Sequence, residues 1–352
     1  MSRTADPPPT SGGGARPTLD AVAARAGVGR GTVSRVINGS PRVSERARTA
    51  VRRAVTELGY VPDRAARTLV TSRTDAVALV VPEKETRLFA EPYFSDIIRG
   101  VTAGLSGTDL QLLLILVRDA RERERLTAYL AARRVDGVLL VSVHRDDPLP
   151  GVLETYDIPS VLAGRRSDGE TLSHVHADNA GGARSAVRHL LGRGCRVVAA
   201  ITGPPDMEAA RARLDGYHEA LERAGLTVDG SLVDCGDFTE EGGREVMRTL
   251  LRRRPDLDAV FAASDVMAAG AVQVLRRAGR RVPEDVAVVG FDDSIVARHT
   301  DPPLTSVRQP VEEMGRTMAR LLLEEMSEGG RPAGRVRREV VLATELVVRG
   351  SA

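Results

Sequence analysis

The sequence predicts an α/β protein that carries a small all-α domain at its N-terminus. Two observations lead to this fold class. Residues 18–58 show the 3.6-residue apolar period of helices, whereas from residue 76 onward short apolar runs alternate with amphipathic segments. Repeated alternation of strand and helix indicates parallel sheets covered by helices.

Composition indicates a globular protein with a sizeable core. The 352 residues are 42% hydrophobic, enough for two or three folding units, and no apolar run reaches the length of a membrane span. Residues 1–17 are rich in Pro, Gly and Ser and lack the apolar core of a secretory signal, so we expect a disordered tail and a cytoplasmic protein. With two cysteines and no CxxC or HExxH motif, we expect neither a metal site nor a cofactor.

Positive charge is concentrated at the N-terminal end. Residues 1–75 carry 13 Arg and six acidic residues, a net +7, whereas the remaining 277 residues carry a net −5. An anionic polymer such as DNA favours a basic block of this kind, because Arg groups near phosphates release condensed counterions. The alternative is an accidental excess of charge on a solvated surface.

Three helices are predicted in the all-α domain. Leu19, Val22, Ala23 and Ala26 fall on one helical face behind Thr18 as the N-cap. A turn at residues 27–29 separates this helix from a second one, and a third helix starts near residue 44. The glycines of the turn do not fit a dinucleotide-binding GxGxxG loop, since a helix precedes them and Thr32 takes the third glycine's place. The order of elements instead indicates a helix-turn-helix unit.

In a helix-turn-helix unit the N-terminal part of the second helix enters the major groove of DNA. Arg30 and Arg35 are each suited to a bidentate contact with a guanine edge, and Gly31 has no side chain to read a base. Thr32, Ser34 and Asn38 suit phosphate or mixed contacts. The alternative is that all six are merely exposed residues of a small helical subdomain.

These features resemble those of the lactose and galactose repressor (LacI/GalR) family of bacterial transcription regulators. The resemblance lies in "TLDAVAARAGVGRGTVSRVINGSPRVSERARTAVRRAVTELGYVPDRAARTLVTSRT" at residues 18–74, in "AVALVVP" directly after it, and in "LATELVVRG" at 342–350. One departure is Gly29, where the family usually has Ser as the N-cap of the recognition helix. Arg30 and Gly31 fall on the family's variable base-reading pair. The resemblance implies a DNA-binding domain at 18–61 and a hinge helix and linker at 62–75.

The segment after the third helix is too short to be a stable helix alone, so we expect it to become ordered on binding. By resemblance it is the hinge helix, which pairs with its copy in a dimer and enters the minor groove. Ala66 and Leu69 fall on the family's minor-groove positions, Leu69 as the apolar wedge, while Arg64 and Arg67 are placed to contact phosphates. Alternatively, Leu69 packs on the neighbouring domain.

From residue 76 the chain alternates between strands and helices. We expect amphipathic helices between most of the strands, which are more numerous than one sheet comfortably holds. The resemblance implies two lobes of the periplasmic-binding-protein type within 76–350, one about 76–177 plus 305–335 and the other about 178–304 plus 336–350. The predicted strands are 76–81, 112–117, 138–143, 160–163, 197–201, 232–234, 259–263 and 286–289.

Polar and aromatic residues at the strand ends match family positions that bind an effector between the lobes. Asp or Arg can engage hydroxyls or a carboxylate through paired hydrogen bonds. Alternatively, the two aspartates cap helices and the two phenylalanines belong to the core. Asp292 and Asp293 are further candidates, and His174 and His176 alone are weak evidence for a metal. The expected effector site comprises Tyr93, Phe94, Asp178, Arg213, Phe238 and Asp265.

Together these observations predict a homodimeric transcription regulator, a repressor rather than an activator, that binds a pseudo-palindromic DNA operator and a small effector, most simply a sugar. No GxSxG or Walker motif supports an enzyme, and a glycosidase would leave the DNA-reading end unexplained. The rival interpretation is a solute-binding protein of the same two-lobe fold. Such a protein would have no use for residues 18–70.

Overall fold

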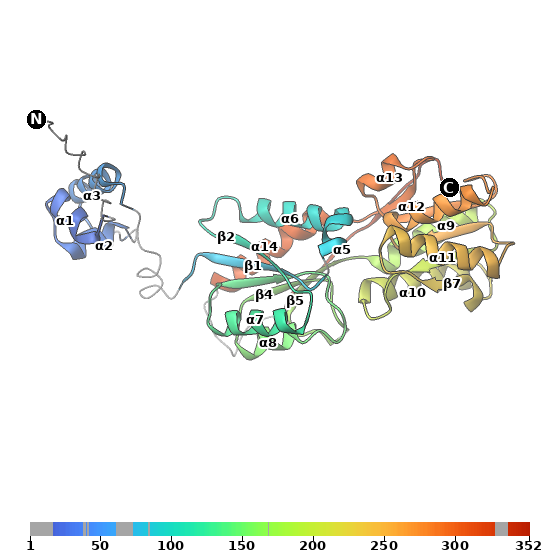
Figure 1. Ribbon diagram of the computed structural model, residues 1–352, viewed down its shortest axis with the longest axis horizontal. Helices are drawn as coiled ribbons and strands as arrows, with labels where there is room; N and C mark the ends of the chain where they lie inside the picture. The colour runs from blue at the N-terminus through green and yellow to red at the C-terminus, as the bar shows by residue number, and fades with distance from the viewer. Residues whose placement is uncertain are drawn as a thin grey trace, which may run out of the picture. The chain divides into compact units, whose positions relative to one another are not determined.

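The computed structural model describes residues 17–37, 40, 42–60, 73–83, 85–167, 169–327 and 337–352. The chain divides into two compact units, Met1–Thr74 and Asp75–Ala352 (Figure 1). Each unit has its own core, so each is described by itself. Among the helices that these residues form, none combines the length and the apolar character that a membrane crossing requires.

The N-terminal unit contains three short helices, α1 (Leu19–Ala26), α2 (Arg30–Ile37) and α3 (Glu45–Leu58). Helix α1 begins as predicted, because the Thr18 side chain accepts a hydrogen bond from the amide of Ala21. It ends at Gly27, whose φ of +66° is a left-handed conformation that glycine adopts without steric cost. The three helices enclose a small core of Val22, Ala23, Val33, Val36, Val51 and Ala54.

The first lobe of the C-terminal unit is built on a six-stranded sheet in the order β11-β5-β4-β3-β1-β2, with every neighbouring pair parallel. Helices α6 and α14 cover one face of this sheet, and α7 and α8 cover the other (Figure 1). The strands are β1 (Ala76–Val81), β2 (Gln111–Leu116), β3 (Gly137–Leu140), β4 (Ser160–Ala163), β5 (Ser173–Ala177) and β11 (Glu339–Leu342). The helices are α5 (Glu85–Ala90), α6 (Pro92–Leu105), α7 (Ala120–Ala131), α8 (Leu149–Thr155) and α14 (Val311–Ser327).

The second lobe has a six-stranded sheet in the order β12-β10-β9-β8-β6-β7. Only the β10–β12 pair among them is antiparallel. Helices α9 and α10 pack together on one face, and α11 and α12 on the other. The strands are β6 (Val198–Thr202), β7 (Val233–Cys235), β8 (Ala259–Ala262), β9 (Ala287–Asp292), β10 (Thr305–Arg308) and β12 (Glu345–Val347). The helices are α9 (Asn179–Gly192), α10 (Glu208–Arg223), the 3-10 turn η1 (Gly230–Leu232), α11 (Glu240–Arg253), α12 (Asp265–Arg277) and α13 (Ile295–His299).

Two of the expected lobe boundaries are wrong by one strand each. Residues 305–308 were expected in the first lobe, but they form strand β10, which pairs with β9 in the second sheet from Thr305↔Val289 to Arg308↔Asp292. Residues 339–342 were expected in the second lobe, but they form strand β11, which pairs with β5 in the first sheet. The chain therefore passes between the lobes three times, after β5, after β10 and after β11, each time within a few residues.

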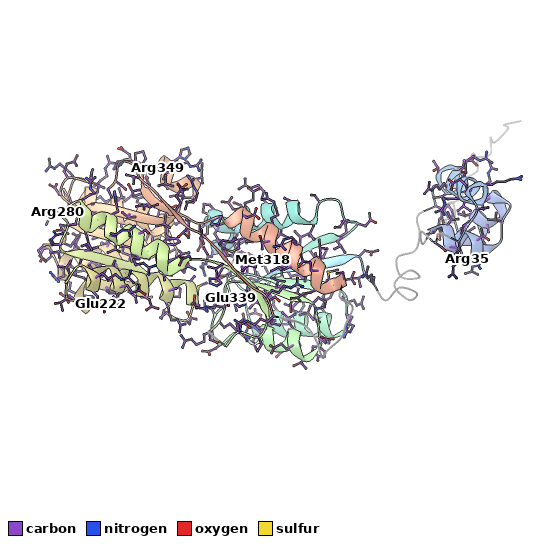
Figure 2. The ribbon with its side chains drawn as sticks, turned by 180° about the vertical axis from the view of Figure 1, so that it is seen from behind. Arg35, Glu222, Arg280, Met318, Glu339 and Arg349 are labelled. Carbon is purple, nitrogen blue, oxygen red and sulfur yellow. The ribbon has the colours of Figure 1, made fainter. Side chains whose placement is uncertain are left out.

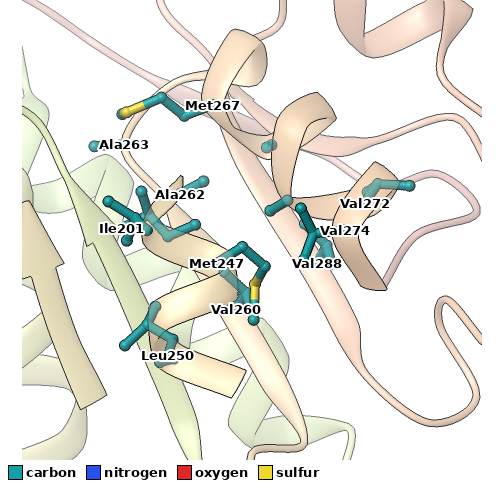
Figure 3. Packing of buried hydrophobic residues seen from close by; sticks show 14 of the residues in the cluster. Ile201, Met247, Leu250, Val260, Ala262, Ala263, Met267, Val272, Val274 and Val288 are labelled. Carbon is teal, nitrogen blue, oxygen red and sulfur yellow. The ribbon is translucent and has the colours of Figure 1, made fainter. Parts of the chain in front are cut away.

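Each lobe is a well-packed body. Figure 3 shows a hydrophobic cluster of the second lobe, in which Met247 and Leu250 of α11 pack near Ile201, Val260 and Val288 of the second sheet. All five side chains are fully buried, and burying one such side chain stabilises the fold by about 1.5–3 kcal/mol. Because both lobes are rigid in this sense, the short crossovers are the natural place for relative motion.

Candidate functional site

Helix α2 presents the predicted DNA-reading residues. Its amphipathic sequence buries Val33 and Val36 against α1 and α3, which turns the opposite face outward. The carbonyl of Gly29, just before the helix, accepts hydrogen bonds from the amide of Thr32 at 2.8 Å and from the amide of Val33 at 3.2 Å. Arg30, Gly31 and Arg35 are exposed, and Thr32 and Ser34 are half-buried.

The two arginines of α2 differ in their partners. Arg30 lies 3.6 Å from Asp20 of α1, an exposed pair worth little in water. Arg35, labelled in Figure 2, forms no ion pair among the residues that the structure describes. The guanidinium of Arg35 is therefore available to a base or a phosphate. Asn38, Arg64, Ala66 and Leu69 lie outside the described residues, and their roles stay predictions.

A cavity lies between the two lobes of the C-terminal unit. About 860 Å³ of space between atoms lies within it, part of which is open solvent. Segments that follow the strands of both sheets supply its walls, as expected for the carboxyl ends of parallel strands. Its lining includes Arg87, Glu91, Tyr93, Phe94, Ser142, Arg165, His176 and Met314 from the first lobe, and Asn179, Met207, Glu208, Arg213, Phe238, Ser264, Asp292 and Gln309 from the second lobe and its crossovers.

Four of the six predicted effector residues line this cavity: Tyr93, Phe94, Arg213 and Phe238. Tyr93 and Phe94 lie in the first turn of helix α6, and their rings meet edge to face with centroids 5.4 Å apart. The Phe238 ring lies against Gly203, where an added Cβ would come within 2.1 Å of the ring. The glycine thus lets an aromatic side chain enter the cavity wall.

Arg213 is the charged centre of the second-lobe wall. Its side chain is buried and stacks on Phe291, with the guanidinium carbon 3.8 Å from the ring centroid. Its Nε donates to Asn179 Oδ1 at 2.9 Å, and its Nη1 lies 3.5 Å from Asp292 Oδ1. The guanidinium is therefore held in one orientation before any ligand arrives.

Asp292 completes this polar group. Burial raises its pKa to about 6, although the charge of Arg213 and a 2.6 Å hydrogen bond from Gln309 Nε2 act in the opposite direction. The residue has a φ of +106°, a costly backbone conformation for a residue with a Cβ. Guanidinium, carboxyl and amide groups thus converge at the point where the chain leaves the second lobe for the first.

The other two predicted residues, Asp178 and Asp265, do not line the cavity. Asp178 caps α9, because its Oδ1 accepts a hydrogen bond from the amide of Gly181 at 2.9 Å. Asp265 is fully buried and accepts from the Ser294 amide at 2.7 Å and from Ser306 Oγ at 2.6 Å. Both carboxylates have hydrogen-bond partners within the protein, and contact of either residue with the effector stays a prediction.

The residues that sequence reasoning missed are close neighbours of the predicted ones. Asn179 follows Asp178, and Ser264 and Val266 flank Asp265, so a shift of one residue separates prediction and structure. Gln309 follows a strand that had not been predicted, and Ser142 falls inside the predicted strand 138–143 although β3 ends at Leu140. A search for polar residues after the predicted strands therefore finds neither.

Arg87 connects the apolar and charged parts of the first-lobe wall. It pairs with Glu83 and with Glu91 Oε1 at 2.6 Å, and its guanidinium carbon lies 5.2 Å from the Phe238 ring centroid across the lobe boundary. Burial raises the pKa of Glu91 to about 7, against the lowering effect of Arg87. Cation and ring contact each other here only while the lobes are close together.

A second group of contacts holds the lobes in the described arrangement. His144 Nδ1 lies 2.6 Å from Asp206 Oδ2, and the amide of Arg145 donates to the Asp206 carbonyl at 2.9 Å. Arg165 pairs with Glu208 at 3.1 Å. The hydrogen bond to Glu83 raises the pKa of His144 to about 9, so its ring is charged at neutral pH. Of these residues, Arg165 and Glu208 line the cavity.

One group of three side chains among the described residues has the donor types of a metal site. His174, His176 and Glu339 place their ligand atoms within 4.8 Å of one another. The two histidines alone were weak evidence for a metal, because the third donor lies more than 160 positions away in the sequence, on β11.

Comparison with known proteins identifies both units. Residues 18–63 match the family model "Bacterial regulatory proteins, lacI family", and residues 187–352 match "Periplasmic binding protein-like domain". The transcriptional regulator CelR of Thermobifida fusca is 56% identical over 338 residues, which cover 96% of this chain and 98% of CelR.

Two solved structures extend the comparison to the fold. A CelR–cellobiose complex aligns with a TM-score of 0.76 and 53% identity, covering 96% of this chain and all of that chain. A Lac repressor dimer bound to operator and the anti-inducer ONPF aligns with a TM-score of 0.82 and 27% identity, covering 96% of this chain and 99% of that one. The resemblance in the sequence motifs is thereby confirmed. The chain belongs to the LacI family of bacterial transcriptional regulators, which join a DNA-reading helix-turn-helix to a periplasmic-binding-protein-like domain.

Proposed function

We propose that this regulator is a homodimeric repressor whose operator affinity changes when a gluco-disaccharide of the cellobiose type binds between its lobes. The observation that carries the proposal is the 53% identity to CelR, which has been solved with cellobiose, together with a cavity of suitable chemistry.

The cavity combines the two kinds of surface that a sugar presents. Arg213, Asn179 and Gln309 offer fixed hydrogen-bonding groups for hydroxyls. Phe238 and the methionines Met207 and Met314 offer apolar surface for the C–H faces of pyranose rings. A neutral disaccharide uses both surfaces without bringing a charge of its own into a wall that already holds Arg213 and Asp292.

The dimer follows from how DNA is read. One α2 helix reads one half-site. Two copies related by a two-fold axis therefore read a pseudo-palindrome whose half-sites are centred one or more helical turns of DNA apart. The operator-bound dimer of the related Lac repressor supports this arrangement. The sugar then favours one arrangement of the lobes and biases the pairing of the two DNA-reading ends.

Isothermal titration of the full chain with cellobiose tests the ligand class. Maltose and lactose serve as disaccharides of other linkage or composition, glucose as a monosaccharide, and a nucleoside as a different class. We expect cellobiose to bind at least about ten-fold more tightly than the others, and Phe238→Ala to weaken it by about 1–3 kcal/mol.

The matched control is Phe89→Ala, since Phe89 is 82% exposed on α5 and does not line the cavity. This variant should bind like the unmodified protein. Tight binding of the nucleoside with none of cellobiose would overturn the proposed ligand class. Equal loss in both phenylalanine variants would argue that the sugar binds outside the cavity.

A further inference from the structure

From the geometry of His174, His176 and Glu339 we infer a binding site for a divalent transition metal, Zn²⁺ by ligand type, on the β5–β11 pair of the first lobe. His176 also lines the inter-lobe cavity, whereas His174 and Glu339 do not, so the site borders the sugar contacts proposed above without sharing their residues. Figure 2 labels Glu339, which opens β11.

Strand pairing brings the three donors together. His174 and His176 lie two residues apart on β5 and therefore point to the same face of the sheet. Glu339 is in direct register with His174 on the parallel partner β11. Its Oε1 lies 3.1 Å from His176 Nε2 and 3.5 Å from His174 Nε2. Ligands about 2.0–2.2 Å from a tetrahedral Zn²⁺ lie about 3.3 Å apart, so these spacings already suit the ion.

The Nδ1 atoms of both rings, which point away from Glu339, already form hydrogen bonds with backbone carbonyls. His174 Nδ1 lies 3.0 Å from the Leu172 carbonyl, and His176 Nδ1 lies 3.1 Å from the Ala177 carbonyl. A carbonyl oxygen only accepts, so each Nδ1 must carry the hydrogen, and in a neutral ring Nε2 then carries a lone pair. A backbone carbonyl that fixes the tautomer of a histidine in this way is the usual second shell of a metal ligand.

The inner nitrogens face the Glu339 carboxylate, and His176 Nε2 hydrogen-bonds with its Oε1 at 3.1 Å. His174 is fully buried, and its Nε2 makes no hydrogen bond among the described residues. A metal ion that binds here would displace the hydrogen from between these atoms, and all three would then act as lone-pair donors to the ion. Two imidazoles and one carboxylate suit Zn²⁺ and leave a fourth position for water.

The surroundings allow the ion to enter and hold the carboxylate. The Glu339 side chain is 39% exposed, so the site opens to solvent. Arg337 and Arg165 approach Glu339 at 3.6 and 3.8 Å, longer than hydrogen bonds, and Arg165 has its closer partner in Glu208. Their positive charge reduces metal affinity without occupying the ligand positions. A bound ion would tie β5 to β11, and both strands run directly into crossovers between the lobes.

The test uses the full chain, stripped with EDTA and then titrated with ZnCl₂, with bound metal counted by elemental analysis. We expect one Zn²⁺ per chain and a higher melting temperature with the metal. Glu339→Gln, which keeps the shape of the side chain, should weaken binding at least ten-fold and abolish the rise in melting temperature. Co²⁺ should give the visible absorption of a tetrahedral nitrogen–oxygen site, and this absorption should disappear in the same variant.

Two variants control for adventitious binding. His299→Asn removes a ring from α13, and Cys235→Ser removes an exposed thiol, and both should bind Zn²⁺ like the unmodified chain. Circular dichroism checks whether Glu339→Gln folds. If it folds poorly, His176→Asn serves as a second substitution of a ligand. Less than one Zn²⁺ per chain at saturation, or equal affinity in folded Glu339→Gln and His176→Asn, would overturn the inference.

Discussion

The DNA-reading helix and the inter-lobe cavity organise their functional residues in opposite ways. On α2 the DNA-reading candidates described here occupy one short stretch, Arg30 to Arg35, and project from a helix whose own core lies on the other face. In the cavity the polar centre joins Asn179, Arg213, Asp292 and Gln309, which are far apart in the chain and mostly buried. Substitutions on the exposed face of α2 can therefore change DNA recognition without loss of stability. Substitutions of the cavity residues also affect stability, because these residues hold the lobe together.

Loss of the Arg35 guanidinium tests the first half of this comparison and carries the largest expected effect. A bidentate base contact is worth about 1–3 kcal/mol, so in a dimer with two half-sites Arg35→Ala should weaken operator binding by about 2–6 kcal/mol. Fluorescence anisotropy with a labelled operator measures this loss. Sugar affinity and melting temperature should stay unchanged.

The matched control for Arg35 is Arg52→Ala on α3, which removes the same charge from another exposed position of the unit. It should weaken operator and unrelated DNA alike and only slightly. A loss as large as that of Arg35→Ala would mean that net charge, not base reading, explains the effect.

Replacing Arg213 with Met tests the second half of the comparison. Breaking a buried ion pair leaves Asp292 without its cation, so Arg213→Met should lower the free energy of unfolding by about 3–5 kcal/mol and abolish measurable sugar binding. Denaturant unfolding and calorimetric titration provide the two readouts. The surface pair of Arg184 and Glu219 offers a control, Arg184→Met, with little effect on either. Unchanged stability in Arg213→Met would contradict the double role assigned to the cavity wall.

Asp265 separates a structural role from a ligand-binding one. Asp265→Ala leaves the Ser294 amide and the Ser306 hydroxyl without their acceptor, so we expect a loss of stability of about 1–3 kcal/mol. Sugar affinity should fall much less than in Phe238→Ala, because Asp265 does not line the cavity. If titrations showed a larger loss of sugar affinity in Asp265→Ala than in Phe238→Ala, Asp265 would be a ligand contact.

The His144 contact between the lobes predicts a smaller, pH-dependent effect. Its pKa is raised in the folded protein from 6.5 to about 9, so its contribution to stability is complete below pH 6.5 and is lost as pH rises through 9. His144→Gln should therefore reduce stability more at pH 6 than at pH 10. Melting temperatures of both proteins across this range measure the difference, and a constant difference would show that the charge of His144 contributes nothing.

The sequence predicted those parts of the molecule that local chemistry determines. The helices of the N-terminal unit follow from a cap, a period and a glycine turn. Strands 76–81 and 160–163 have the predicted bounds, the first as a continuous apolar run and the second as an apolar run that follows Ser160. Strand β5 was not predicted, since histidines interrupt its apolar pattern, and β11 lies at a sheet edge with alternate residues exposed. Their roles depend on pairing with each other across more than 160 residues.

The sequence predicted where the candidate site lies and which kinds of side chain form it, but not always which residue faces the cavity. The strand ends were correct locations, yet a strand end offers several consecutive side chains, and the backbone decides which of them faces the cavity. Asp178 turns back to cap α9 while Asn179 meets Arg213, and Asp265 turns to Ser294 while Ser264 lines the wall. No pattern in the sequence distinguishes such neighbours, because the choice depends on hydrogen-bond partners from other segments.

The central claim is that sugar in the cavity controls DNA binding by the N-terminal unit, and operator affinity with and without saturating cellobiose tests it most directly. We predict a change of at least about five-fold, the lower end of typical allosteric coupling, and its loss in Phe238→Ala. An operator affinity that stays constant while calorimetry shows the cavity filled would contradict the account.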